Sequence, residues 1–226
     1  MNIQRINSYT DDRFTPEILR QHGAFLIDGK YPCGFEIVDD RSAKMYYHDY
    51  EDTEKVEEIL EAFRFYTGHI TRFYTPEGDL LKEYEPVKLF DLPLREIQPS
   101  QFYVDQEKLA AVGSFIQREE DIVIPVMEYE GSYVSEDGHT RLYLAHRRGY
   151  ARVRAFLEEE GTGYIPDFVE EARSRGIYHV GDMTELSHEE YEEKWNRFCD
   201  AFFARLEERE DPEKGETMEG QGKTIR

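Results

Sequence analysis

Residues 132–149 constrain the fold of this chain more than any other stretch. Ser132–Ser135 has a β-type composition, Asp137-Gly138 interrupts it, and an apolar helical pattern follows from His139. The first N–H groups of such a helix have no intrahelical partner, and the helix dipole adds partial positive charge there. Gly138 permits a tight turn and the close approach of a ligand to the backbone. The stretch therefore predicts an anion-binding site at the start of a helix.

The segments on either side of this stretch predict an α+β domain. Residues 105–117 place Leu109, Val112 and Ile116 on one helical face, and the nearly continuous apolar run 122–127 favours a buried strand. Together with a strand near Ile97 and another over 151–156, the order of elements is β-α-β-β-α-β.

The two ends of the chain predict further structure. Before residue 87 we expect a short helix after Thr15-Pro16, three strands, a helix and two strands. After residue 160, Pro166 and Gly176 bracket one helix, and the capping-box pattern Ser187–Glu190 opens a longer one. The N-terminal strands are expected at 24–28, 34–38, 43–48, 69–74 and 80–84, with the helix at 52–66. The predicted parts are an N-terminal α+β subdomain (1–86), the β-α-β-β-α-β core (87–160), a C-terminal helical appendage (161–207) and a disordered tail (208–226).

Composition limits the classes of partner. The 226 residues include 28 Lys and Arg and 49 Asp and Glu, which gives a net charge of −21 and opposes general binding to nucleic acid. No apolar run is long enough to span a membrane, and the N-terminus lacks the apolar core of a signal peptide, so we expect a cytoplasmic protein without a membrane partner. Cys33 and Cys199 are too few for a disulfide framework or a zinc site.

Positive charge is concentrated after Gly138. Five arginines in this region form a basic island that suits a small phosphorylated ligand better than a long duplex. For Arg147 and Arg148 the alternative is that they complement the dipole at a helix C-terminus. His139 and His146 lie two helical turns apart, which is a weak metal signal, and we predict no metal site made of protein side chains alone. The five arginines are Arg141, Arg147, Arg148, Arg152 and Arg154.

The order and spacing of these motifs resemble the ParB/sulfiredoxin superfamily over about residues 90–157. The resemblance is carried by Ile97-x-Pro99, Leu109 in its helix, Ile124-Pro125-Val126, the run Asp137–Arg141, and Arg148-Gly149. It implies a nucleotide-binding core on which several chemistries are found.

The residues after Gly138 narrow those chemistries. Sulfiredoxins, which the motif resembles, carry a cysteine at the position of His139. Because that cysteine is missing here, sulfiredoxin activity is not expected. His139-Thr140 replaces the Glu-Arg of partition proteins, and no helix-turn-helix follows, so a DNA-partition role is disfavoured. The motif is similar to the Asp-Gly-His-His-Arg of free-serine kinases, matching at Asp137, Gly138, His139 and Arg141 and departing at Thr140.

This resemblance implies roles for six residues. Asp137 and His139 would be catalytic, and Gly138, Thr140, Arg141 and Gln101 would bind the nucleotide and its phosphates. The implied cofactor is ATP or another nucleotide with Mg²⁺, which Asp137 would hold.

Gln101 is a departure from the kinases. The free-serine kinases carry a glutamate near the corresponding position, where it acts as general base. A glutamine cannot accept the proton of the substrate hydroxyl. Asp105 and Glu107, at the start of the following helix, are the substitutes that the sequence offers.

Two hypotheses of different class follow. The first is an ATP- or ADP-dependent kinase, or a nucleotide hydrolase, whose partners are a nucleotide and a small hydroxyl metabolite such as free serine. The second is a non-catalytic nucleotide-binding regulator or adaptor, favoured by Gln101 and by the aromatic-rich ends of the chain. The tyrosine-rich segment Met45–Tyr50 is interpreted as packing or as a face that binds a protein partner.

Overall fold

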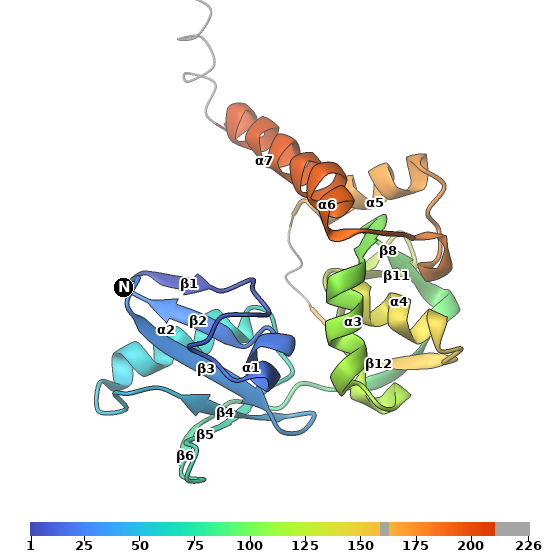
Figure 1. The fold of residues 1–226 in the computed structure, drawn as a ribbon. Coiled ribbons are helices and arrows are strands. Elements are labelled where there is room, and N and C mark those ends of the chain that lie inside the picture. Colours follow the sequence, from blue (N-terminus) through green and yellow to red (C-terminus); the bar gives the residue numbers. More distant parts are fainter. Residues whose placement is uncertain (159–162, 211–226) are drawn as a thin grey trace, which may run out of the picture.

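A computed structural model of the chain describes residues 1–158 and 163–210 and has a mixed α/β architecture (Figure 1). The two larger sheets, each with its own buried core, lie side by side, and the C-terminal helices pack on the second. The α+β class expected from the sequence is confirmed at this level. None of the helices in the described part of the chain is long and apolar enough to cross a membrane.

The first sheet, with the helices packed on it, forms the N-terminal domain. Its strands follow chain order, and all pairs are antiparallel except β4 with β5. The predicted apolar stripe of the long helix is buried as Val56, Ile59, Leu60 and Phe63. The elements are β1 (Ile3–Arg5), α1 (Pro16–Arg20), β2 (Ala24–Ile27), β3 (Tyr31–Ile37), β4 (Ser42–Tyr46), α2 (Thr53–Arg64), β5 (Arg72–Tyr74) and β6 (Leu80–Glu83).

The N-terminal strands and helices expected from the sequence are present, with one addition. Strand β1 was not predicted, because three residues carry no periodicity of their own and become a strand only by pairing with β2. The tyrosine-rich segment packs: Tyr47 is buried, and the Tyr50 hydroxyl donates to the Met45 carbonyl at 2.6 Å.

The second sheet has the strand order β7-β12-β10-β11-β8. β11 runs parallel to β8 and β10 parallel to β12, whereas β10 and β11 form an antiparallel hairpin. From β8 onward the main elements follow the predicted order. They are β7 (Phe90–Pro93), β8 (Ile97–Pro99), β9 (Tyr103–Asp105), α3 (Gln106–Phe115), β10 (Val123–Tyr129), β11 (Ser132–Ser135), α4 (His139–Arg147) and β12 (Arg152–Leu157).

Aromatic side chains dock the C-terminal segment on this core. Phe168 and Trp195 are buried, and Phe102 makes edge contacts with Trp195 and Phe198 at 4.8 and 5.0 Å between ring centroids. The segment comprises α5 (Ile165–Ser174), β13 (Thr184–Leu186), α6 (His188–Tyr191), a π-helical turn and α7 (Arg197–Glu210). β13 was not predicted, and neither was β9, with which it pairs. α7 extends past residue 208, where we expected the tail, and residues 211–226 lie outside the described part of the chain.

The capping box at the start of α6 makes a stability prediction. The Glu190 N–H donates to the Ser187 hydroxyl at 3.3 Å, and the Ser187 N–H donates to the Glu190 carboxylate at 3.4 Å. We expect Ser187→Ala to lower the free energy of unfolding by about 1 kcal/mol, with Ser187→Asp retaining most of it. Urea denaturation monitored by circular dichroism measures both, and Ser174→Ala, in the last turn of α5, is the control. Equal midpoints for Ser187→Ala and the wild type would contradict the prediction.

Candidate functional site

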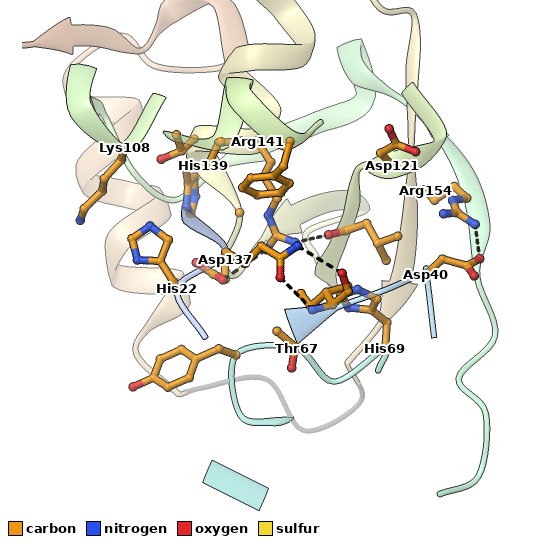
Figure 2. A pocket seen from close by; sticks show the side chains of 18 of the residues that line it. His22, Asp40, Thr67, His69, Lys108, Asp121, Asp137, His139, Arg141 and Arg154 are labelled. Carbon is orange, nitrogen blue, oxygen red and sulfur yellow. Dashed lines mark hydrogen bonds and ion pairs between the residues drawn. The ribbon is translucent and has the colours of Figure 1, made fainter. Parts of the chain in front are cut away.

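A cleft of about 840 Å³ lies between the N-terminal domain and the second sheet (Figure 2). The N-terminal domain lines it with the end of β1, the turn after α1, the end of β3 and the loop after α2. The other wall is formed by one side of α3, the start of α4, the loop before β10, part of β12 and Tyr191. All six residues to which the sequence analysis gave a role line this cleft. They are Gln101 and the five neighbours Asp137–Arg141.

Gly138 is the N-cap of α4 and adopts the left-handed conformation, with φ 82°. A Cβ atom there would lie 2.7 Å from Cγ2 of Ile124, so both the backbone and the space require glycine. Because glycine has no side chain to cap the helix, no side-chain cap bond is made, and the first helical bond runs from the Leu142 N–H to the Gly138 carbonyl at 2.9 Å. The earlier N–H groups, including that of Thr140, remain as donors at the cleft.

Arg141 is held by a backbone carbonyl and by Asp137 and remains partly exposed. Its Nη1 donates to the Val123 carbonyl at 2.6 Å, and its Nη2 lies 3.4 Å from the Asp137 carboxylate. The side chain is 20% exposed, and burial lowers its pKa, an effect that Asp137 opposes. This arrangement holds a positive charge near the N-terminus of α4 and leaves some of the five guanidinium N–H donors unused.

Asp137 keeps an ionised carboxylate in the cleft. Its side chain is 60% exposed to the cleft. Desolvation raises its pKa, but Arg141, the Gly138 N–H and other nearby cations outweigh that effect, so the pKa is lowered. The carboxylate is therefore charged at neutral pH, and it lies beside the helix N-terminus rather than capping it.

His139 is buried and ties two strand ends together. Its Nε2 accepts the Ser100 N–H at 3.2 Å and lies 3.0 Å from the Ser135 hydroxyl. Burial lowers its pKa to about 4, with Arg141 acting in the same direction and Asp137 against it. Because Nε2 is an acceptor, the neutral ring carries its proton on Nδ1. The hydrogen bonds give His139 a structural role at the ends of β8 and β11, and its catalytic role stays a prediction.

Hydrogen bonds hold the Gln101 side chain in place, and neither acidic residue suggested as a replacement base lies at the cleft. The Gln101 amide donates to the Tyr103 carbonyl and, at 3.2 Å, to the Tyr191 hydroxyl. Asp105 is fully buried, caps α3 by accepting the Glu107 N–H at 2.8 Å, and lies 2.7 Å from Nδ1 of His188. Neither Asp105 nor Glu107 lines the cleft, so the idea that one of them replaces a base there is wrong.

The basic island does not act as one unit. Arg147 pairs with Glu185, Arg152 pairs with Asp91, and Arg148 donates to the carbonyls of Ile116 and Gly113 at 2.6 and 2.9 Å. Only the remaining two of the five arginines line the cleft. The expectation of a single island is wrong, because successive positions of α4 point to different sides and β12 presents its arginines separately.

Arg154 joins the two walls. Its Nη1 lies 2.6 Å from the Asp40 carboxylate of the N-terminal domain. Beside it, His69 is buried, and its Nδ1 has no hydrogen-bond partner among the described residues. Desolvation, with Arg141 and Arg154 acting in the same direction and Asp40 against it, lowers the pKa of His69 to about 3. This end of the cleft holds a neutral histidine and a bridging ion pair.

The sequence did not point to four cleft residues: Arg5, His22, His69 and Lys108. Lys108 lies in the first turn of α3, and burial lowers its pKa although Asp105 opposes this. Its ammonium lies 4.8 Å from the centre of the Tyr191 ring. The other three come from the N-terminal domain, where the sequence gave no signal of a site.

A divalent cation fits this cleft only together with a ligand. The described residues contain no group of three His, Cys, Asp or Glu side chains that could hold a metal ion. Mg²⁺ is commonly held by one or two carboxylates together with substrate phosphates and water. Asp137, next to the N-cap of α4, is one of the carboxylates that line the cleft.

No protein-family model matches the chain, and no curated protein is significantly similar to it. Among solved structures, the crystal structure of protein Atu1540 from Agrobacterium tumefaciens resembles 43% of this chain, with a TM-score of 0.32 and 12% sequence identity. The similar region spans 62% of that protein's length. A similarity of this size carries no argument about function, so what the cleft binds must follow from its own side chains.

Proposed function

We propose that this chain is a nucleotide-binding protein with a ParB/sulfiredoxin-like core, and that the cleft holds the phosphates at the start of α4. One observation carries the proposal: the N-terminus of α4 has no side-chain cap and lies at the cleft, which Lys108 and Arg141 also line. Helix N-termini of this kind bind phosphate through N–H groups and the dipole. The volume of about 840 Å³ is within the range of about 300–1,000 Å³ typical of small-molecule sites.

The strand order supports the core that the motifs resemble. β8 and β11 are parallel neighbours, so their carboxyl ends meet where His139 binds Ser100 and Ser135. The loop after β8 carries Gln101, and the turn after β11 carries Asp137 and Gly138. The resemblance places the nucleotide at this same edge, which is where the cleft lies.

Nucleotide titration tests the proposal. We expect ATP or ADP to bind, with Lys108→Met weakening the affinity about tenfold or more, because a charge-assisted contact to a phosphate is lost. Methionine keeps the aliphatic stem beside Tyr191. The matched control is Arg147→Met, which removes one positive charge from α4 outside the cleft. Isothermal titration calorimetry without Mg²⁺ measures each affinity, and failure of the wild type to bind any nucleotide would overturn the proposal.

A second candidate function is phosphoryl transfer to a small hydroxyl metabolite such as free serine. Ionised Asp137 favours it, because that carboxylate lies among cations at the phosphate end of the cleft. In the transfer, the acceptor oxygen forms a new P–O bond, the bond to the departing nucleotide breaks, and the hydroxyl proton is released. Mg²⁺ held by Asp137 would neutralise part of the phosphate charge.

Turnover separates a kinase from a non-catalytic regulator. Phosphorus NMR of wild-type protein with ATP or ADP, Mg²⁺ and a panel of hydroxyl metabolites should show a phosphate ester. We expect Asp137→Asn to slow its formation at least about 100-fold while Mg²⁺-free nucleotide binding is retained. Nucleotide binding without turnover across the panel would leave the regulator as the function.

A further inference from the structure

The N-terminal domain contributes an arginine that is held in place on the cleft wall. Arg5 ends β1, and its Nε donates to the His22 carbonyl at 3.1 Å. Its guanidinium lies over the Tyr66 ring, 4.0 Å from the centroid. Both contacts are made by the N-terminal domain, while the side chain lines the cleft shared with α3 and α4. The orientation of Arg5 is thus set before any ligand arrives.

The turn that holds Arg5 has a strained backbone and packs closely on its surroundings. His22 has φ 55°, in the left-handed region that non-glycine residues rarely adopt. Its Nε2 is 2.9 Å from the Tyr9 hydroxyl. A Cβ atom at Gly23 would clash with the Phe35 carbonyl, so the chain after His22 packs directly on β3. Backbone strain of this kind persists only where the surrounding structure imposes it, and it is concentrated at functional sites.

Three cations of the cleft walls lie near one another. Arg5 interacts electrostatically with Asp137 and Arg141, and Lys108 interacts with Asp105, Arg5 and Asp137. The other carboxylates that line the cleft are Asp39, Asp40, Glu120 and Asp121. Within the described ranges, Arg5 and Lys108 form no ion pair with any carboxylate. Desolvation lowers the pKa of Arg5, with Tyr66 and Asp137 opposing that effect and Arg141 adding to it. Several partly buried like charges are unfavourable unless an anion lies among them.

We propose that the terminal phosphate of a nucleoside di- or triphosphate is gripped between the two domains, by Arg5 on one side and by Lys108 and Arg141 on the other. This rests on the proposed function and adds the ligand class and the role of the N-terminal domain. Three cations spread over both walls match the charge of a polyphosphate better than that of a monophosphate. The Arg5 guanidinium contributes planar, paired donors of the kind that bind phosphate oxygens.

Calorimetric titration of the full chain with ADP and AMP tests this. We expect Arg5→Met to weaken ADP binding about tenfold or more and to change AMP binding less than about threefold. Arg5→Lys, which keeps the charge and loses the paired donors, should fall between Arg5→Met and the wild type. Arg13→Met, which removes an arginine paired with Asp11 outside the cleft, is the control.

The outcomes distinguish the two proposals. If the wild type binds no nucleotide, both fail. If the wild type binds ADP and Arg5→Met binds it equally well, the gripping role of Arg5 is wrong and the proposed function stands. Equal losses for ADP and AMP would also overturn the polyphosphate assignment. A urea denaturation curve for each variant confirms that the comparison is between folded proteins, and Arg5→Lys supplies the comparison if Arg5→Met unfolds.

Discussion

Lowering the pH from 7 to 5 is expected to reduce the free energy of unfolding by about 4 kcal/mol, through two buried histidines. His69 and His139 are 7% and 6% exposed, and burial lowers their pKa values to about 3 and about 4. The unfolded chain binds protons at these rings near pH 6.5, whereas the folded protein does not. The unfolded state therefore gains protons first as the pH falls, and each ring contributes about 2 kcal/mol of the loss at pH 5.

Two other histidines modify this expectation. Desolvation and neighbouring cations lower the pKa of His22 to about 4, which adds to the loss. A hydrogen bond to Asp105 raises the pKa of His188, so that residue stabilises the folded protein below pH 6.5 and opposes the loss. Since the His188 side chain is 45% exposed, its contribution is screened and smaller.

Substitution of His69 isolates one contribution. His69→Leu should remove the contribution of about 2 kcal/mol that this ring makes to the loss at pH 5. It should leave stability at pH 7 unchanged or higher, because Nδ1 has no partner to lose. Urea denaturation at pH 7 and pH 5 measures both effects. His179→Gln, on a side chain that is 65% exposed, is the control and should keep the pH dependence of the wild type. Equal wild-type stability at the two pH values would show that the buried rings are not neutral in the fold.

Gly138→Ala is expected to lower the free energy of unfolding by about 3 kcal/mol. Part of the loss comes from the backbone, because alanine is strained at φ 82°. The rest comes from contact, since the new methyl group would lie 2.7 Å from Ile124 and 3.0 Å from Nη2 of Arg141. Displacing that guanidinium should also weaken nucleotide binding.

Gly131→Ala separates the two causes. Gly131, in the turn between β10 and β11, has φ 77°, and no atom lies within 4 Å of the place that an alanine methyl group would occupy. The substitution should cost about 1 kcal/mol, from backbone strain alone. Chemical denaturation of both variants gives the difference. If the two losses are equal, the close packing around Gly138 is not what requires glycine there.

Much of the secondary structure follows from local pattern. The stripe of α2, the Ser187 capping box and the turn at Gly138 lie in the structure where the sequence predicts them. The strands β1, β9 and β13 escaped prediction because each has three residues and exists only by pairing with a distant strand. The sequence also did not predict that the five arginines separate, because arginines that are close in sequence pair with carboxylates in different parts of the fold.

The strand, glycine turn and helix start that present backbone donors at Gly138 could be read from local sequence, because glycine's allowed φ and the helical period act over a few residues. Local sequence also indicated Asp137, in that turn, and Arg141, in the first turn of α4. That Arg5, His22 and His69 face this turn across a cleft became evident only in the folded chain, since they lie more than 60 residues away in sequence. Their approach depends on how two separately packed cores meet, and no local pattern encodes such a contact.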